Sequence, residues 1–289
     1  MSVMRPRPIY VAGDSQSLIY GDRVWFEARH DCYVGRSVYC GGLYAGSLAA
    51  ADGTLDEAVV TAFRGARLLS LVGDELHASH VSPDPHVFSL AQADGRPVVE
   101  PPLAFTVGQL DLQRLARHLP GDDVELPPGV GERFDVLPEG RSSDDDACPA
   151  AELLASIEAQ FDGFRFGARR LRQLGFQRIA VVSIPPPSAD DALMRAIRAM
   201  IGLPDNPRRH HKRLRYKLVL ALNYALARLC DEEGLDFIDR WPEQTVRGVV
   251  RPGVLTDGIH LSGEAADQTV RRLALWAENA AAGVPALPR

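Results

Sequence analysis

Short apolar segments alternate along this chain with longer amphipathic ones. The apolar segments are rich in β-branched and aromatic residues, which is typical of buried strands, and they are centred on Ile9, Val38, Leu69, Val181 and Phe237. Between them, apolar residues recur at three- and four-residue steps, most clearly over 151–174, which predicts helices. This alternation predicts an α/β fold, a three-layer α/β/α sandwich around a central, mostly parallel five-stranded sheet.

One long segment does not follow the alternation. Residues 78–150 contain Pro127-Pro128-Gly129 and the acidic run Asp144-Asp145-Asp146, and we expect a loop-rich insertion there. The acidic run is interpreted as solvated surface rather than a metal site, because neighbouring residues with no partner ligands at suitable spacing cannot surround one ion. The whole chain, 1–289, is expected to form one domain that carries this insertion.

Composition excludes several classes of function. The chain has 289 residues, 46% of them hydrophobic, and a net charge of -6, which offers nucleic acid or an anionic membrane no general attraction. The basic run 208–215 is interpreted as a solvated helix start or a contact to an anionic substrate. No apolar run is long enough to span a membrane, and the first residues lack the apolar core of a signal peptide.

The cysteines do not indicate a metal or redox site. They are four in number and form no C-x-x-C pair: Cys32, Cys40, Cys148 and Cys230. We therefore expect free thiols in a cytoplasmic protein with no cofactor and no metal. The oligomeric state is not predicted.

The first segment with candidate chemistry is Gly13-Asp14-Ser15, directly after the apolar run Ile9–Ala12. Gly permits a tight turn at the strand end, and Asp can bond the backbone that follows it. Ser15 then lies at the carboxyl end of a strand, where open α/β sheets bind their ligands. The alternative is that Asp14 or Ser15 merely caps a helix.

A second segment near the C-terminus changes that balance. Asp257 and His260 stand three residues apart, just before the final predicted helix. This spacing can bring an imidazole beside a carboxylate that orients it. A hydroxyl, an imidazole and a carboxylate together form the catalytic unit of serine hydrolases.

In this order, the two segments resemble the first and last sequence blocks of the SGNH (GDSL-type) hydrolase superfamily, which has a flavodoxin-like sandwich. The resemblance implies that Ser15 is the nucleophile, His260 the general base and Asp257 the residue that orients it. It also implies a backbone donor to the oxyanion from a second, Gly-rich block. Gly42 and Gly46 both fit that block, and the sequence does not choose between them.

The third block of the family departs from its pattern in this chain. The family carries Asn two residues after a Gly, as an oxyanion donor, whereas Glu75 follows Gly73 here. A carboxylate would repel an oxyanion, and Glu75 could donate to one only if it were protonated, which needs a strongly raised pKa. His77, which resembles the His of a Gly-Gly-Asn-x-His subgroup, is the other candidate. The segment Gly108-Gln109-Leu110-Asp111 resembles a Gly-Glu-Ile-Asp variant and makes Gln109 a reserve donor. The earlier segment is preferred because its distance from Ser15 suits the family better.

The resemblance implies a serine ester hydrolase that removes a small acyl group, such as acetyl, from a small-molecule ester, on a carbohydrate or another metabolite. Two alternatives stay open. The same triad could transfer the acyl group to an acceptor alcohol instead of water. The chain could also be a non-catalytic binding module. A distance between Ser15 and His260 that is too long for a hydrogen bond would support that alternative.

Overall fold

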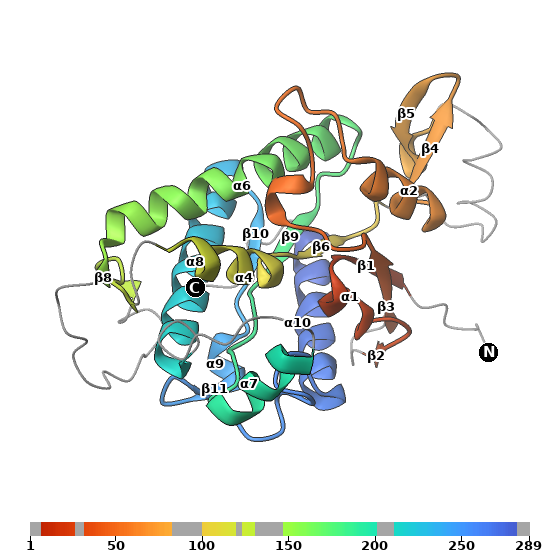
Figure 1. The fold of residues 1–289 in the computed structure, drawn as a ribbon. Coiled ribbons are helices and arrows are strands. Elements are labelled where there is room, and N and C mark those ends of the chain that lie inside the picture. The colour runs from red at the N-terminus through yellow and green to blue at the C-terminus, as the bar shows by residue number, and fades with distance from the viewer. Residues whose placement is uncertain are drawn as a thin grey trace.

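The computed structural model describes residues 7–26, 32–82, 100–119, 123–130, 147–200 and 211–281. The acidic run 144–146 and the first part of the basic run, 208–210, lie outside the described residues. Figure 1 shows the arrangement of the helices and strands, with helices packed on both sides of a central sheet.

Five parallel strands form the centre of the fold, as the sequence predicts. Their order in the sheet is β10 (Asp236–Ile238), β9 (Ile179–Val182), β6 (Leu103–Thr106), β1 (Arg7–Gly13) and β3 (Cys32–Tyr39), and the short β2 (Val24–Phe26) adds an antiparallel edge. Gly13 is in register with both Thr106 and Tyr39. The carboxyl ends of three neighbouring strands therefore meet at one edge, next to Ser15.

The prediction of the third strand is wrong in position. Leu69 lies in β4 (Leu69–Val72), which among the described strands pairs with β5 (Glu75–Ala78) in an antiparallel hairpin and not with the central sheet. Strand β6 takes its expected place in the sheet. All four residues of β6 are buried, whereas Leu71 is 43% exposed. A strand covered on both faces needs apolar side chains on both. The Gly73-Asp74 loop between β4 and β5 is a hairpin signal.

This correction also changes the expected insertion at 78–150. The segment contains β6, which is a central strand, and α4 (Gln109–His118), which packs on the sheet. The described part of 78–150 therefore contributes to the sheet and to one of its layers, while 83–99, 120–122 and 131–146 lie outside the described residues.

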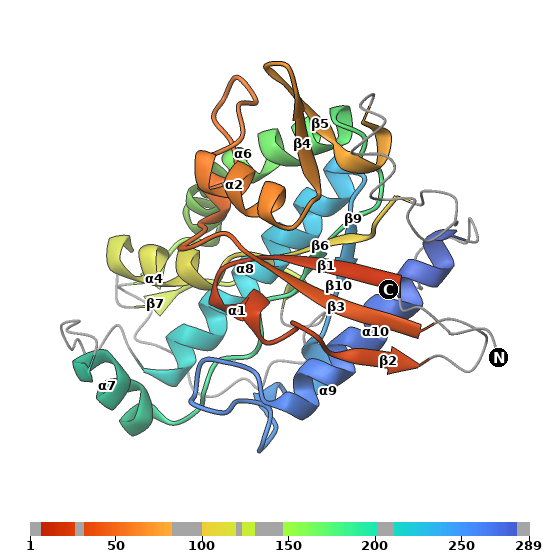
Figure 2. The same ribbon diagram turned by 90° about the vertical axis from the view of Figure 1, so that its right-hand side faces the viewer.

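Two apolar layers enclose the sheet. One contains α2 (Glu57–Gly65), α4, α6 (Ala150–Gln173) and α8 (Lys212–Glu233), and the other is built mainly on α10 (Gly263–Ala281). Strand β1 serves both layers, because Ile9 and Val11 face α10 while Ala12 faces the larger cluster. Figure 2 shows α10 and α8 on opposite sides of the strands.

Shorter elements complete the described chain. They are α1 (Ser15–Leu18), η1 (Ala45–Ser47), η2 (Ser79–Val81), β7 (Asp123–Val124), β8 (Ala147–Cys148), α7 (Asp191–Met200), α9 (Trp241–Gln244), β11 (Thr245–Val246) and β12 (Val249–Val250). The four cysteines are free and buried. Among the described helices, none combines the length and the apolar character needed to cross a bilayer.

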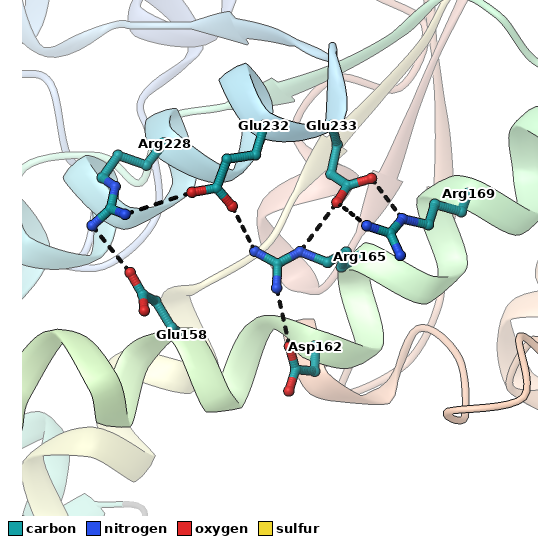
Figure 3. A network of polar contacts seen from close by, with 7 residues as sticks. All are labelled: Glu158, Asp162, Arg165, Arg169, Arg228, Glu232 and Glu233. Carbon is teal, nitrogen blue, oxygen red and sulfur yellow. Dashed lines mark hydrogen bonds and ion pairs between the residues drawn. The ribbon is translucent and has the colours of Figure 1, made fainter.

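Charged side chains join α6 to α8 on the surface (Figure 3). Arg165 pairs with Glu232 at 2.8 Å and with Glu233 at 3.1 Å, and Arg169 pairs with Glu233 at 2.7 Å. The side chain of Glu233 is only 8% exposed, whereas Glu158, which pairs with Arg228, is 46% exposed. Burial strengthens charge-assisted contacts, so Glu233 is the central carboxylate of this network.

We expect Glu233→Gln to lower the free energy of unfolding by about 1–2 kcal/mol at low salt, because two arginines lose their shared carboxylate. The matched change Glu158→Gln, at an exposed pair, should cost less than about 0.5 kcal/mol. Urea denaturation in 20 mM and 1 M NaCl measures both effects, and the cost at Glu233 should shrink in the higher salt. Equal costs at the two positions would contradict this assignment.

Candidate active site

Ser15 is held at the carboxyl end of β1 by its two neighbours. A Cβ on Gly13 would overlap with the carbonyl oxygen and hydroxyl of Thr106, so only glycine lets β1 and β6 approach this closely. Asp14 is the N-cap of α1, and its Oδ1 accepts a hydrogen bond from the Gln16 N–H at 2.9 Å. The capping role considered for Asp14 is therefore real, and it leaves Ser15 as the exposed first residue of the helix.

His260 lies in a loop that is folded around the Asp257 carboxylate. Oδ1 of Asp257 accepts hydrogen bonds from the backbone N–H groups of Ile259 at 2.9 Å and His260 at 2.7 Å. A bridge between Leu255 and Leu261 closes the loop just before α10. These local bonds follow from an Asp whose side chain can turn back to the backbone two and three residues later.

The structure brings the three predicted residues together. Nδ1 of His260 lies 2.7 Å from Oδ2 of Asp257, and Nε2 lies 3.1 Å from Oγ of Ser15. A carboxylate only accepts, so Nδ1 carries the hydrogen and Nε2 is left to accept the hydroxyl proton of Ser15. This geometry can deprotonate the hydroxyl when the oxygen attacks a carbonyl carbon.

The pKa of Asp257 suits the orienting role. Partial burial raises it, but the hydrogen bonds from the backbone and ring of His260 and from the Ile259 N–H outweigh that effect and lower the pKa to about 2. The carboxylate is therefore ionised at neutral pH, and it favours the positive charge that develops on the imidazole when His260 takes a proton.

Two groups of backbone donors lie near Ser15. The loop after β3 is tied to β1 by the Cys40 N–H, which bonds the Gly13 carbonyl at 2.9 Å. Within the described residues, the N–H groups of Ser15 and Gly42 donate to no acceptor. Both glycines are exposed, but a Cβ on Gly46 would meet the Gln160 carbonyl oxygen of α6 at 2.7 Å, whereas one on Gly42 would meet only the Leu110 side chain at 3.9 Å. Gly42 is also closer in the chain to Cys40, which is bonded to Gly13, and we therefore take Gly42 as the candidate donor.

Glu75 and His77 are not brought near Ser15. Their hairpin is fixed where α6 leads into β9: the Ala78 N–H bonds the Leu174 carbonyl, five residues before β9 begins. That is the amino edge of the sheet, opposite to the edge with Ser15, and Figure 2 shows β4 and β5 apart from α1. The expectation that Glu75 or His77 replaces the missing Asn is therefore wrong, because their strand is not part of the central sheet.

Gln109, unlike Glu75, lies at the edge of the sheet that carries Ser15. It is the first residue of α4 and lies three residues beyond Thr106, whose partner in the neighbouring strand is Gly13. The turn between them requires glycine at position 108 for two reasons. Its φ is +102°, and a Cβ there would meet the Ile184 side chain at 2.5 Å. The reserve segment is therefore at the correct edge for a third donor.

Asp111 is a polar residue to which the sequence interpretation assigned no role. It is fully buried in the first turn of α4, and its Oδ2 accepts a hydrogen bond from the Ala45 N–H at 3.0 Å. This bond joins α4 to the loop that carries Gly42. Burial raises the pKa of Asp111. Its position was detectable, because it precedes the buried Leu115 by one helical turn, on the face where a charge is unusual.

Asp14 is the second buried carboxyl group at this edge. Burial raises its pKa from 3.8 to about 6; the Gln16 N–H opposes this shift, and the charge of Asp111 adds to it. A raised pKa means that the folded protein binds the proton more tightly than the unfolded chain does. Stability from this group therefore increases as the pH falls from 6 towards 4 and is lost as the pH rises.

We expect Asp14→Asn to stabilise the protein at pH 7, because Asn is an equally good N-cap and carries no charge to bury. A pKa raised from 3.8 to about 6 corresponds to about 3 kcal/mol as an upper bound. The advantage of the variant should shrink between pH 7 and pH 4.5, as measured by urea denaturation of both proteins. A difference that does not change with pH would contradict the assigned pKa.

No group of three or more His, Cys, Asp or Glu side chains in the described ranges is arranged to hold a metal ion.

Comparison with known proteins gives matches among solved structures only. No family model and no curated protein matches the chain. An extracellular lipase from Streptomyces rimosus has 11% identity and a TM-score of 0.42, over 93% of this chain and 98% of its own. A carbohydrate acetylesterase from Sinorhizobium meliloti has 15% identity and a TM-score of 0.36, over 95% and 99%. A GDSL-like lipase from Bacteroides thetaiotaomicron has 10% identity and a TM-score of 0.37, over 95% and 89%.

Proposed function

We propose that this chain is a serine ester hydrolase of the SGNH type that removes a small acyl group from an alcohol. The single observation that supports this most is the continuous chain of hydrogen bonds from Ser15 Oγ through His260 to Asp257, with distances of 3.1 and 2.7 Å. Capping, the plain alternative for the first motif, does not require His260 to be within hydrogen-bond distance. A binding module would not need that alignment either.

In the proposed mechanism, Ser15 Oγ attacks the ester carbonyl carbon while Nε2 of His260 takes the hydroxyl proton. The tetrahedral oxyanion is held by the N–H groups of Ser15 and Gly42, with the Gln109 amide as the side-chain donor. His260 then gives the proton to the departing alcohol, which leaves an acyl-enzyme on Ser15. Water, deprotonated by the same imidazole, hydrolyses the acyl-enzyme and restores the free hydroxyl.

The preference for a short acyl group, on a carbohydrate or another metabolite, rests on the resemblance of the two motifs to SGNH hydrolases. It is tested by comparing p-nitrophenyl acetate with butyrate and octanoate. Turnover that rises with chain length would contradict the preference without affecting the triad.

A fluorophosphonate probe tests the proposal directly, since it reacts only with an activated serine hydroxyl. We expect one label per wild-type molecule, on the peptide that contains Ser15, and none after Ser15→Ala. No labelling and no hydrolysis of any ester would contradict the proposal and favour a binding module. With an added alcohol as acceptor, an ester product in excess of free acid would show that the same triad transfers the acyl group.

A further inference from the structure

The side chain of Gln16 joins the two loops that carry the catalytic candidates. Gln16 is 2% exposed, and its Nε2 donates a hydrogen bond to the carbonyl oxygen of Ile259 at 3.0 Å, across 243 positions of sequence. It directly follows Ser15, and Ile259 directly precedes His260. This contact therefore links the backbone on either side of the hydroxyl–imidazole pair.

Both ends of this link are fixed by other bonds. The Gln16 N–H is bound to Asp14, so the start of its side chain is held by the N-cap of α1. The Ile259 N–H is bound to Asp257, and its carbonyl is bound to Gln16. The orientation of the backbone that enters His260 is thus determined by two side chains, one from each loop.

The rest of the Gln16 amide makes no bond that would explain its presence. Its Oε1 is buried and has no hydrogen-bond donor among the described residues. An apolar side chain of similar length would fill the same space without burying an unbonded oxygen. A glutamine is therefore a poor choice for packing alone, and the bond from Nε2 to Ile259 is the contact that distinguishes it.

We propose that Gln16 is a positioning residue that sets the distance between Ser15 Oγ and His260 Nε2 by holding the Ile259 carbonyl. This inference rests on the proposed function. The loop around Asp257 has exposed side chains, since Asp257 is 53% and His260 40% exposed. Among the described residues, the loop is also held by the buried Leu261, by the packing of Leu193 and Ile197 against Gly258, and by the His260–Ser15 contact itself. None of these three apolar contacts reaches from α1 to the loop.

Gln16→Met tests the proposal, because methionine has nearly the same length and volume but no N–H donor. We expect kcat for p-nitrophenyl acetate to fall about 10- to 100-fold, as a displacement of about 1 Å in a reacting pair does. KM should stay within about twofold, since substrate binding uses other groups. The rate of fluorophosphonate labelling at Ser15 should fall in parallel with kcat, and the melting temperature should change little.

Gln160→Met is the matched control. Gln160 also donates its Nε2 to a backbone carbonyl, that of Ser156 at 3.2 Å, and also has a buried Oε1 without a partner. Its bond lies within α6, so we expect unchanged kcat and labelling. Equal losses in both variants would show a general effect on stability and would overturn the proposal.

Hydrogen exchange separates failure of this inference from failure of the proposed function. In Gln16→Met, the backbone amides of 259 and 260 should exchange faster than in the wild type, whether or not the protein is an esterase. Wild-type kcat in the variant would overturn the positioning role. If the wild type shows neither hydrolysis nor labelling, the proposed function fails, and unchanged exchange would then also refute the link between the loops.

Discussion

Ser15→Ala and His260→Ala are each expected to lower kcat for short-chain p-nitrophenyl esters by at least about 10⁴-fold, with no loss of folded structure. In the proposed mechanism the hydroxyl and the imidazole act as one unit, because the proton would pass along the 3.1 Å contact between them. Removing either group stops the same step. The double variant should therefore be no slower than the single ones, and Asp257→Asn should cost nearly as much by reversing the tautomer of His260.

The control for this series is His77→Ala, which removes a histidine at the opposite edge of the sheet. It should leave kcat unchanged, and so should Glu75→Gln. Rates are compared by steady-state kinetics, and circular dichroism checks that each variant is folded. Additive losses in the double variant, or a large loss at His77, would contradict the assignment of the active site to the carboxyl ends of β1 and β6.

Gly163→Ala is expected to lower kcat about 100-fold although Gly163 lies in the middle of α6. A Cβ at this position would overlap with the carbonyl oxygen of Gly46 and meet that of Ala49 at 3.0 Å. Backbone cannot yield as a flexible side chain can, so η1 must move away from the helix. The loop between Gly42 and Ala45 is continuous with η1, and a displacement of about 1 Å in an oxyanion donor typically costs about 10²-fold.

Gly65→Ala is the matched control, because Gly65 ends α2 and a Cβ there would meet no atom within 4 Å. That variant should keep wild-type kcat. In Gly163→Ala, the loss should appear in kcat more than in KM, as measured with p-nitrophenyl acetate. A fully active Gly163→Ala protein would show that η1 does not support the oxyanion donors.

The sequence pattern predicts the wrong segment as the third strand, because two segments share the same pattern. Each is an apolar run followed by glycine and polar residues. The two segments, Leu69–Val72 and Leu103–Thr106, differ in how far other elements pack on their two faces. That packing exists only in the folded chain. Local signals did distinguish them in part. The Gly73-Asp74 loop is of the hairpin type, whereas Gly108 is followed by the amphipathic helix α4.

Sequence alone determined the elements whose causes are local. Strand β1 needs only its apolar run, the turn after it needs Gly13 and Asp14, and the wrapping of Asp257 around the N–H groups of Ile259 and His260 spans three residues. Such contacts form between neighbours on the chain and leave a readable spacing. The parallel α/β architecture followed from the same periodicity.

The tertiary structure decided which of these elements meet. Three contacts join residues that are far apart along the chain: Gln16 with Ile259, Asp111 with Ala45, and Gly163 with Gly46. No spacing in the sequence predicts such contacts. They depend on the order of strands in the sheet and on how closely α6 approaches η1. Those are outcomes of packing the whole core, in which many weak contacts compete at once.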